Sequence, residues 1–216
     1  MVKRFDLLQS LAKIVKDELV VTNLKGTANE WCHLSPKDSN LYYVGIGLVS
    51  PVALGLAMAL PHRKVVALDG DGSLLLDLSI FPTIAMSKAS NLTVICFDNE
   101  CYESNGGLPT ATAISTDLAG IAKASGVKAT CVRELEEFNA AAREALTMEG
   151  PHFIDAKVER GTMKVPVTMT YGRYNKYSFV KYIERTEGVK ILSSIKAAGK
   201  AYSPNPNYFI GTPTRE

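Results

Sequence analysis

Apolar runs alternate along the chain with segments of helical periodicity. Unbroken runs of apolar and β-branched residues predict strands that are buried on both faces of a sheet. The expected strands cover residues 18–24, 41–47, 64–70, 91–99, 128–133 and 151–158. Apolar residues spaced three and four apart predict helices between these runs. The expected helices cover residues 5–15, 50–60, 76–89, 115–126, 134–149 and 178–199.

This alternation predicts an α/β fold: a doubly wound, mainly parallel sheet with helices on both faces. A polar connection is expected between the first two strands. At 216 residues the chain is long enough for one well-filled core and short for two. We therefore expect a single domain over residues 1–192 and a C-terminal tail over 193–216.

Composition and charge narrow the possible partners. The net charge of +2 gives no reason to expect nucleic acid or a membrane surface. No stretch approaches the length of a membrane span, and polar residues interrupt the amphipathic N-terminal segment, unlike a signal peptide. The four cysteines are scattered without a CxxC pair, which indicates reduced thiols and a cytoplasmic protein.

The stretch "VVALDGDGSLLLDL" places Asp69 and Asp71 at the end of a buried strand. Two carboxylates there repel each other and lose hydration, unless a cation or backbone donors compensate. Asp98 and Asn99 stand at the end of the next strand along the chain. The spacing between Asp71 and Asn99 suits one crossover with its helix, so these oxygen-bearing side chains are expected at neighbouring strand ends.

Such an arrangement suits Mg²⁺, which prefers oxygen ligands and combines one or two protein side chains with phosphate oxygens. Gly70 and Gly72 would let the backbone approach a diphosphate, and Ser73 would add a hydroxyl donor. The alternative is a tight turn in which Asp71 is the N-cap of the following helix and Asp69 caps the turn. The matching Asn99 favours the metal.

The motif "GDGS", followed one crossover later by "DNECYES", resembles the signature of enzymes that depend on thiamine diphosphate. The similarity is to their diphosphate-binding domain. It implies that thiamine diphosphate is the cofactor and that Asp71, Asn99 and the backbone carbonyl of Cys101 hold Mg²⁺. The family more often has Asn-Asn, with glycine at the carbonyl position, where this chain has Asp98-Asn99 and Cys101.

The upstream stretch "YYVGIGLVSP" extends this resemblance. It implies that Ile46 wedges the cofactor into a bent shape and that the backbone around Val44 and Gly45 accepts its 4′-amino group. The alternative for Ile46 is a core residue. The other cofactor-binding residues implied by the resemblance are Thr27, Gly70, Gly72, Ser73 and Tyr102.

More narrowly, residues 18–192 resemble sulfopyruvate and phosphonopyruvate decarboxylases, especially the separate β-type subunit. The resemblance implies decarboxylation of a small 2-oxo acid to an aldehyde and CO₂, with Asn105 and Leu108 on the substrate side. Two departures stand out: Lys25 occupies a glycine position, and Leu108 replaces an amide. The alternatives are a carboligase or transferase subunit similar to acetolactate synthase, and a non-catalytic subunit that only holds the cofactor.

Enzymes of this family activate the cofactor with a glutamate from a second, pyrimidine-binding domain. Glu30, Glu100 and Glu103 are the nearest candidates here, but none lies in the family's glutamate context. We expect all three to be surface or loop residues, and a separate pyrimidine-binding α subunit to supply the catalytic glutamate. The apolar helix expected over 50–60 is either a packing surface for that subunit or a plain core helix.

Overall fold

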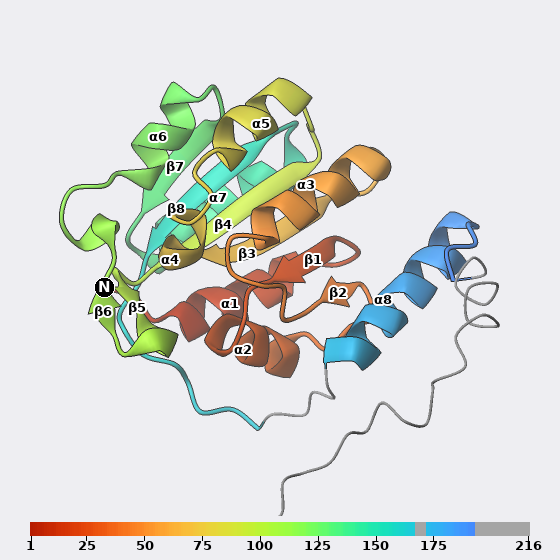
Figure 1. Cartoon of the computed structure of the whole chain (residues 1–216), viewed down its shortest axis with the longest axis horizontal. Coiled ribbons are helices and arrows are strands. Elements are labelled where there is room, and N and C mark those ends of the chain that lie inside the picture. Colours follow the sequence, from red (N-terminus) through yellow and green to blue (C-terminus); the bar gives the residue numbers. More distant parts are fainter. Residues whose placement is uncertain (167–171, 193–216) are drawn as a thin grey trace, which may run out of the picture.

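The computed structural model describes residues 1–166 and 172–192. Its centre is a six-stranded parallel sheet with the order β2-β1-β3-β4-β8-β7 (Figure 1). The strands are β1 (Leu19–Thr22), β2 (Asn40–Leu41), β3 (Val65–Gly70), β4 (Leu92–Asp98), β7 (Lys128–Val132) and β8 (His152–Lys157). The predicted α/β fold with a parallel sheet is confirmed.

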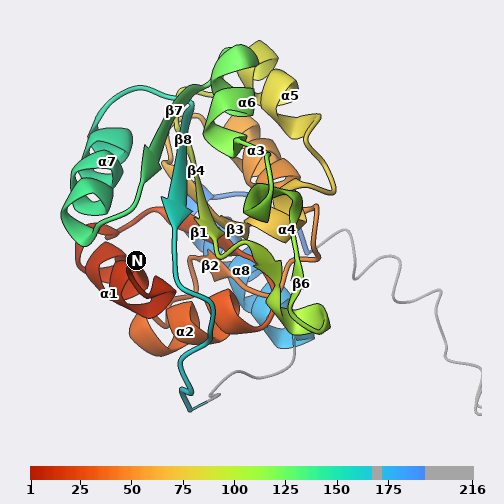
Figure 2. The same cartoon turned by 90° about the vertical axis from the view of Figure 1, so that its left-hand side faces the viewer.

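Helices cover both faces of this sheet (Figure 2). One face carries α3 (Val49–Ala59), α5 (Ile80–Ser87) and α6 (Leu118–Ala124), and the other carries α1 (Arg4–Ile14), α2 (Gly26–Leu34) and α7 (Leu135–Thr147). Successive strand residues alternate between the two cores. In β3, Val65 and Ala67 face the α3 side, whereas Val66 and Leu68 face the α1 side. Burial on both faces explains why these strands are continuously apolar.

The last helix, α8 (Gly172–Glu187), protects the β2 edge of the sheet. Asn175 is buried there; its side chain accepts a hydrogen bond from Tyr42 N at 2.7 Å and donates one to Asn40 O at 2.9 Å. Unpaired backbone groups at a sheet edge invite pairing with other chains. The amide of Asn175 satisfies two of them.

The order of the strands defines where a ligand is expected. From β1 the chain moves outward to β2, and it then returns to the other side of β1 to form β3. The connections therefore leave in opposite directions at the carboxyl ends of β1 and β3, which is the usual ligand position in open α/β sheets. The short helix α4 (Asp71–Leu74) follows β3, and a small hairpin of β5 (Cys101–Tyr102) and β6 (Leu108–Pro109) follows β4.

Two predicted elements near this end differ from the structure. The strand expected over 41–47 ends at Leu41, because Tyr43 and Gly47 adopt left-handed conformations with φ of 59° and 76°. The polar connection before it contains α2, whose Trp31 is fully buried. One large apolar side chain anchors this helix, so its sequence lacks the longer apolar pattern that predicts a helix.

Two predicted helices have different bounds. Residues 76–79 form turns that close α4, with Leu76 N donating to Ser73 O, so α5 begins at Ile80. The helix expected over 178–199 begins earlier and ends at Glu187. Residues 193–199 and the predicted tail lie outside the described residues. Among the residues that are described, no helix is long and apolar enough to cross a membrane, and the four cysteines form no disulfide.

Candidate functional site

A cavity of about 400 Å³ lies at the carboxyl ends of β1, β3 and β4. It brings together most of the residues that the sequence singles out. These are Thr27, Ile46, Gly70, Asp71, Gly72, Ser73, Asn99, Cys101, Tyr102 and Asn105. The wall also contains residues that the sequence did not indicate, namely Arg4, Asn23, Asn29 and Thr162, together with Glu103, which the sequence predicted only as a surface or loop residue.

Three of the predicted residues do not line this cavity. The backbone around Val44 and Gly45 is engaged locally: Val44 N donates to Thr22 O and Gly45 O accepts from Leu48 N, each at 3.1 Å. Leu108 lies on β6 with 65% of its surface exposed. Ile46, in contrast, lines the cavity and is 46% exposed, so the alternative of a core residue is wrong.

Asp71 is the first residue of α4 and is almost fully buried at the cavity wall. Gly70, not Asp71, occupies the N-cap position, so the capping alternative for Asp71 is wrong. One carboxylate oxygen, Oδ2, accepts a hydrogen bond from Thr110 Oγ1 at 2.6 Å. Burial raises the pKa of Asp71 to about 6; the Thr110 bond opposes this shift, and the charge of Asp98 adds to it.

Asp69 has a different role, because its carboxylate faces the interior of the fold. It accepts hydrogen bonds from Ser50 Oγ at 2.8 Å, from Gly70 N at 2.9 Å and from Asn23 Nδ2 at 3.2 Å. Burial raises the pKa of this carboxyl above its usual value. Asp69 thus ties the end of β3 to α3 and to the loop after β1.

Asn99 follows β4 and is held at both ends of its amide. Its Nδ2 donates to Glu103 Oε2 at 2.9 Å, and its Oδ1 accepts from Cys101 N at 3.2 Å. The side chain is buried and lines the same cavity as Asp71. The predicted meeting of Asp71 and Asn99 at neighbouring strand ends is therefore confirmed, because β3 and β4 pair in parallel.

The hairpin after β4 determines where the carbonyl of Cys101 points. Thr110 N donates to Glu100 O at 3.3 Å, and Gly107 N donates to Tyr102 O at 3.0 Å. These bonds flank Cys101 on both sides. Because hydrogen-bonded and free positions alternate along an antiparallel strand, the Cys101 carbonyl is directed away from β6. It is thus available to a ligand, as an oxygen donor should be.

The prediction that Glu30 is a surface or loop residue is wrong. Its side chain is fully buried on α2 and accepts two hydrogen bonds from the guanidinium of Arg4, at 2.8 and 3.2 Å. Arg4 also donates to Thr162 Oγ1 at 2.9 Å, and this hydroxyl donates to Glu103 Oε1 at 2.7 Å. Burial of this ion pair is tolerated because each charge is compensated by its partner and by further hydrogen bonds. Glu100, in contrast, lies in the loop before β5, with a left-handed φ of 58°.

Two glycines at this cavity leave room for side chains that pack directly against their backbone. A Cβ on Gly26 would lie 2.5 Å from Arg4 Nη2, so only glycine lets the guanidinium pack against the N-terminus of α2. A Cβ on Gly72 would lie 2.5 Å from the ring of Tyr102. Lys25, directly before Gly26, has a positive φ of 51°, a backbone conformation that favours glycine, as does the glycine position that the resemblance implies there.

The donor set fits a diphosphate with a divalent cation. The nine-residue helix α2 begins at the cavity, where its free N–H groups favour an anion. In the described part of the chain, no group of three or more His, Cys, Asp or Glu side chains is arranged to hold a metal alone. Mg²⁺ needs no such group, because it takes few protein ligands and completes its shell with phosphate oxygens and water.

Comparison with known proteins identifies relatives of the chain. Residues 26–156 match the family model described as "Thiamine pyrophosphate enzyme, C-terminal TPP binding domain". Sulfopyruvate decarboxylase subunit beta of Methanothermobacter thermautotrophicus is 33% identical over 168 residues, which cover 77% of this chain and 88% of that protein. Sulfopyruvate decarboxylase of Methanosarcina acetivorans is 34% identical over 165 residues, which cover 76% of this chain and 42% of that one.

Solved structures show the same fold. The crystal structure of benzoylformate decarboxylase from Polynucleobacter necessarius superimposes with a TM-score of 0.67 at 23% sequence identity. The match covers 76% of this chain and 34% of that chain. The chain therefore spans about a third of this structural relative.

Proposed function

Because this chain belongs to the thiamine pyrophosphate enzyme family, as its C-terminal TPP-binding domain, we propose that it is one subunit of a heteromeric 2-oxo acid decarboxylase. The complete enzyme would use thiamine diphosphate and Mg²⁺ and release an aldehyde and CO₂. One observation carries this proposal: Asp71, Asn99 and Cys101 line the same cavity as the N-terminus of α2.

Different residues of the cavity would bind the metal ion and the diphosphate. Asp71, the Asn99 side chain and the Cys101 carbonyl would hold Mg²⁺, while Thr27 at the start of α2 and Ser73 would meet the diphosphate. A pKa of about 6 leaves Asp71 ionised at neutral pH, as a metal ligand must be. The bound cofactor supplies the carbanion chemistry, and this chain supplies orientation and electrostatics.

A partner subunit completes the proposal. Glu103 lines the cavity and Glu30 lies beside it, and both carboxylates already accept hydrogen bonds, Glu30 from Arg4 and Glu103 from Asn99. This supports the proposal that the catalytic glutamate comes from another chain. The beta subunit of Methanothermobacter thermautotrophicus, whose name implies an alpha subunit, is matched over most of its length. Exposed apolar side chains at the loops around the cavity offer a surface for such a partner. They are Ile46, Leu48, Leu76, Leu108 and Ile114.

The apolar helix α3 mainly serves the core. Val49, Ala53, Leu54 and Ala57 are buried against the sheet, as expected for a core helix. Its outer side carries Met58, which is 60% exposed. Met58 lies in the last turn of the helix, at the end away from the cavity, so it does not belong to the surface that we assign to the partner.

The substrate class follows from the mouth of the cavity. Lys25 Nζ donates to Ser104 O at 3.2 Å, beside Asn105. The positive ammonium group of Lys25 therefore lies where an acidic substrate would enter. A 2-oxo acid, whose carboxylate is an anion, suits this position. The exposed Leu108 offers no donor, so Lys25 is the group that we assign to the acid.

The test is co-expression with the chain that carries the partner glutamate. The complex should release CO₂ from a panel of 2-oxo acids, whereas the purified single chain should not. In the complex, Asp71→Ala should abolish Mg²⁺-dependent retention of thiamine diphosphate during dialysis, since it removes the only charged ligand. Asp38→Ala, at an exposed site outside the cavity, is the matched control. Turnover by the single chain, or full retention by Asp71→Ala, would refute the proposal.

A further inference from the structure

We propose that Thr110 and Glu103 are positioning residues, which fix the orientation of Asp71 and Asn99 toward a divalent cation. Neither touches the cation itself in this proposal. The inference rests on the proposed function, in which Asp71 and Asn99 hold Mg²⁺. Both positioning residues belong to the segment that runs through β5 and β6, directly after Asn99.

Thr110 acts on the carboxylate of Asp71. Its hydroxyl is 2.6 Å from Oδ2, whereas the hydroxyl of Thr112 is 3.4 Å from the same atom. Thr110 is 1% exposed, so water does not compete for this bond. With Oδ2 occupied by a donor, Oδ1 is the oxygen that remains for a cation. Thr110 thereby selects one carboxylate orientation among those that an isolated aspartate would adopt.

Glu103 acts on the amide of Asn99. An amide offers an oxygen at one end and two N–H donors at the other, and only the oxygen binds a cation. Glu103 Oε2 accepts from Asn99 Nδ2 at 2.9 Å, which fixes the donor end of the amide. The amide oxygen is then necessarily turned to the other side.

Glu103 is itself held in place before any ligand arrives. Thr162 donates to its Oε1 at 2.7 Å, and Arg4 Nη1 lies 3.7 Å from its Oε2. Arg4 is in turn fixed by the buried Glu30. The orientation of Asn99 is thus transmitted from a rigid ion pair on the α1 side of the sheet. Groups that hydrogen-bond to metal ligands act in this way in many metal sites.

The side chain of Thr110 can be changed without removing the backbone contacts of the hairpin. Its N–H bond to Glu100 O and the pairing of β5 with β6 do not depend on the hydroxyl. Thr110→Val, which replaces the hydroxyl by a methyl group, is therefore the decisive variant. Thr110→Ser restores the hydroxyl. Thr93→Val is the matched control, because Thr93 is equally buried and its hydroxyl donates to Ala145 O, outside the cavity.

The experiment titrates Mg²⁺ against retention of thiamine diphosphate by the full chain in complex with its partner, at pH 8. Thr110→Val should raise the Mg²⁺ concentration for half-maximal retention by about 10–100-fold, as is typical for groups that orient metal ligands. Thr110→Ser should return it to within a few-fold of the unmodified protein. Thr93→Val should not change it. Mn²⁺ binding, followed by electron paramagnetic resonance, should show the same order without any turnover.

Glu103 is tested by the same titration. Glu103→Gln keeps an acceptor for Asn99 Nδ2 and should stay within a few-fold of the unmodified protein. Glu103→Leu removes the acceptor and should raise the Mg²⁺ requirement. Equal effects of the two substitutions would overturn the role of Glu103, because charge and not orientation would then be responsible.

The outcomes separate this inference from the proposed function. If Asp71→Ala retains the cofactor, the metal site itself is wrong. If Asp71→Ala loses the cofactor but Thr110→Val and Glu103→Leu titrate like the unmodified protein, only the positioning role is overturned. An increase in the Mg²⁺ requirement that Thr93→Val reproduces would also overturn it, since a general loss of stability would then explain the effect.

Discussion

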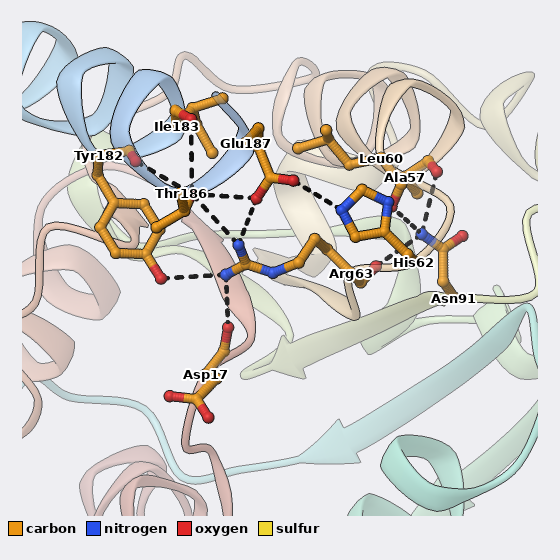
Figure 3. A network of polar contacts seen from close by, with 10 residues as sticks. All are labelled: Asp17, Ala57, Leu60, His62, Arg63, Asn91, Tyr182, Ile183, Thr186 and Glu187. Atoms are coloured by element: carbon orange, nitrogen blue, oxygen red, sulfur yellow. Dashed lines mark hydrogen bonds and ion pairs between the residues drawn. The ribbon is translucent and has the colours of Figure 1, made fainter. Parts of the chain in front are cut away.

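The two ends of the parallel sheet both carry polar networks, but the charges are balanced at the amino end and predominantly negative at the carboxyl end. At the amino end, Arg63 joins the sheet to α8 (Figure 3). Its guanidinium donates to Glu187 Oε1 at 2.6 Å, to the Tyr182 hydroxyl at 3.0 Å and to Asp17 O at 2.9 Å. His62 Nε2 lies 2.6 Å from the other oxygen of Glu187. We call these contacts of Arg63 and His62 the α8 latch.

The carboxylate of Glu187 is compensated within the α8 latch itself. Burial acts to raise the pKa of Glu187, but the hydrogen bonds from His62, Thr186 and Arg63 prevail and lower it. The neighbouring Asn91 lies within hydrogen-bond distance of three backbone carbonyls, those of Ala57, Leu60 and Arg63 (Figure 3). The Arg63 guanidinium and the Glu187 carboxylate each meet an opposite charge or a dipole in this network.

The carboxyl end contains an excess of buried negative charge. Lys157 forms ion pairs with Asp98 and Asp155, while Asp69 and Asp71 are buried nearby with hydroxyl and amide donors only. Burial raises the pKa of Asp155 to about 6, as it does for Asp71. The comparison teaches that the latch is built for the folded chain alone. The excess of buried carboxylates at the cavity would be compensated by the cation of the proposed function.

The largest expected effect is the loss of stability when Arg63 is removed from the α8 latch. Arg63→Met leaves Glu187 largely buried with only His62 opposite, and removal of one partner of a buried pair should lower the free energy of unfolding by about 3 kcal/mol. Urea denaturation measures this loss. Arg185→Met is the control, because Arg185 is exposed and, within residues 1–166 and 172–192, its guanidinium lies over the ring of Tyr182, at 5.7 Å. The Mg²⁺ requirement should not change; a change would show that the two ends are coupled.

The second-largest expected effect is a gain in stability when one buried negative charge is removed at the carboxyl end of the sheet. Asp71→Asn removes the charge but keeps the shape. The displacement of the pKa from 3.8 to about 6 corresponds to about 3 kcal/mol at pH 7, and the weaker hydrogen bond from Thr110 to an uncharged amide offsets about 1 kcal/mol, so the metal-free protein should gain about 2 kcal/mol in free energy of unfolding. The same variant should lose Mg²⁺-dependent retention of the cofactor. Asp155→Asn is the control: it removes another buried carboxylate of raised pKa, outside the cavity, and should leave the Mg²⁺ requirement unchanged.

The sign of the pH dependence follows from the same shift. Because the folded pKa of Asp71 lies above the unfolded value, the folded chain binds the proton more tightly. Its contribution to stability is fully present below pH 4 and is lost as the pH rises to about 6. Denaturation of the metal-free protein between pH 4 and 7 should therefore show a decline that Asp71→Asn reduces. An unchanged pH profile in Asp71→Asn would contradict the raised pKa.

The smallest effect concerns substrate preference at the rim of the cavity. Leu108→Gln introduces an amide at the position where the resemblance to the decarboxylases implies one, and a hydrogen bond to a charged group contributes about 1.5 kcal/mol or more. The ratio of kcat/KM for sulfopyruvate over less charged 2-oxo acids should rise by about tenfold in the assembled enzyme. If the unmodified enzyme already prefers sulfopyruvate and the substitution changes nothing, Leu108 has no part in recognition.

The sequence was sufficient for what depends on local pattern. Continuous apolar strands predicted the parallel sheet, and the spacing of Asp71 and Asn99 predicted their meeting at neighbouring strand ends. The glycine-rich context of Ile46 separated it correctly from core isoleucines. These features are visible because period and spacing translate directly into faces and edges of a sheet.

Contacts between distant segments were not predictable in this way. Arg4 and Glu30 lie on different helices, and nothing in either segment indicates that they form a buried ion pair. Thr162 reaches Glu103 from the segment after β8, 59 residues further along the chain. Such partners depend on how loops fold over the sheet, which a single sequence does not encode as a repeat or a motif. Surface location is the usual prior for a glutamate, and Glu30 is an exception because it is compensated.

Leu108 lies on β6 and Thr110 directly follows that strand, yet Leu108 faces outward at 65% exposure while the Thr110 hydroxyl donates to Asp71. In the proposed assembly, a partner that packs against Leu108 would stiffen the segment that positions Asp71. By thermodynamic reciprocity, a cation that fixes Asp71 and Thr110 would strengthen the same subunit contact by an equal free energy. Assembly and metal loading would then be one coupled equilibrium, in which unassembled subunits would hold the cofactor more weakly than assembled ones.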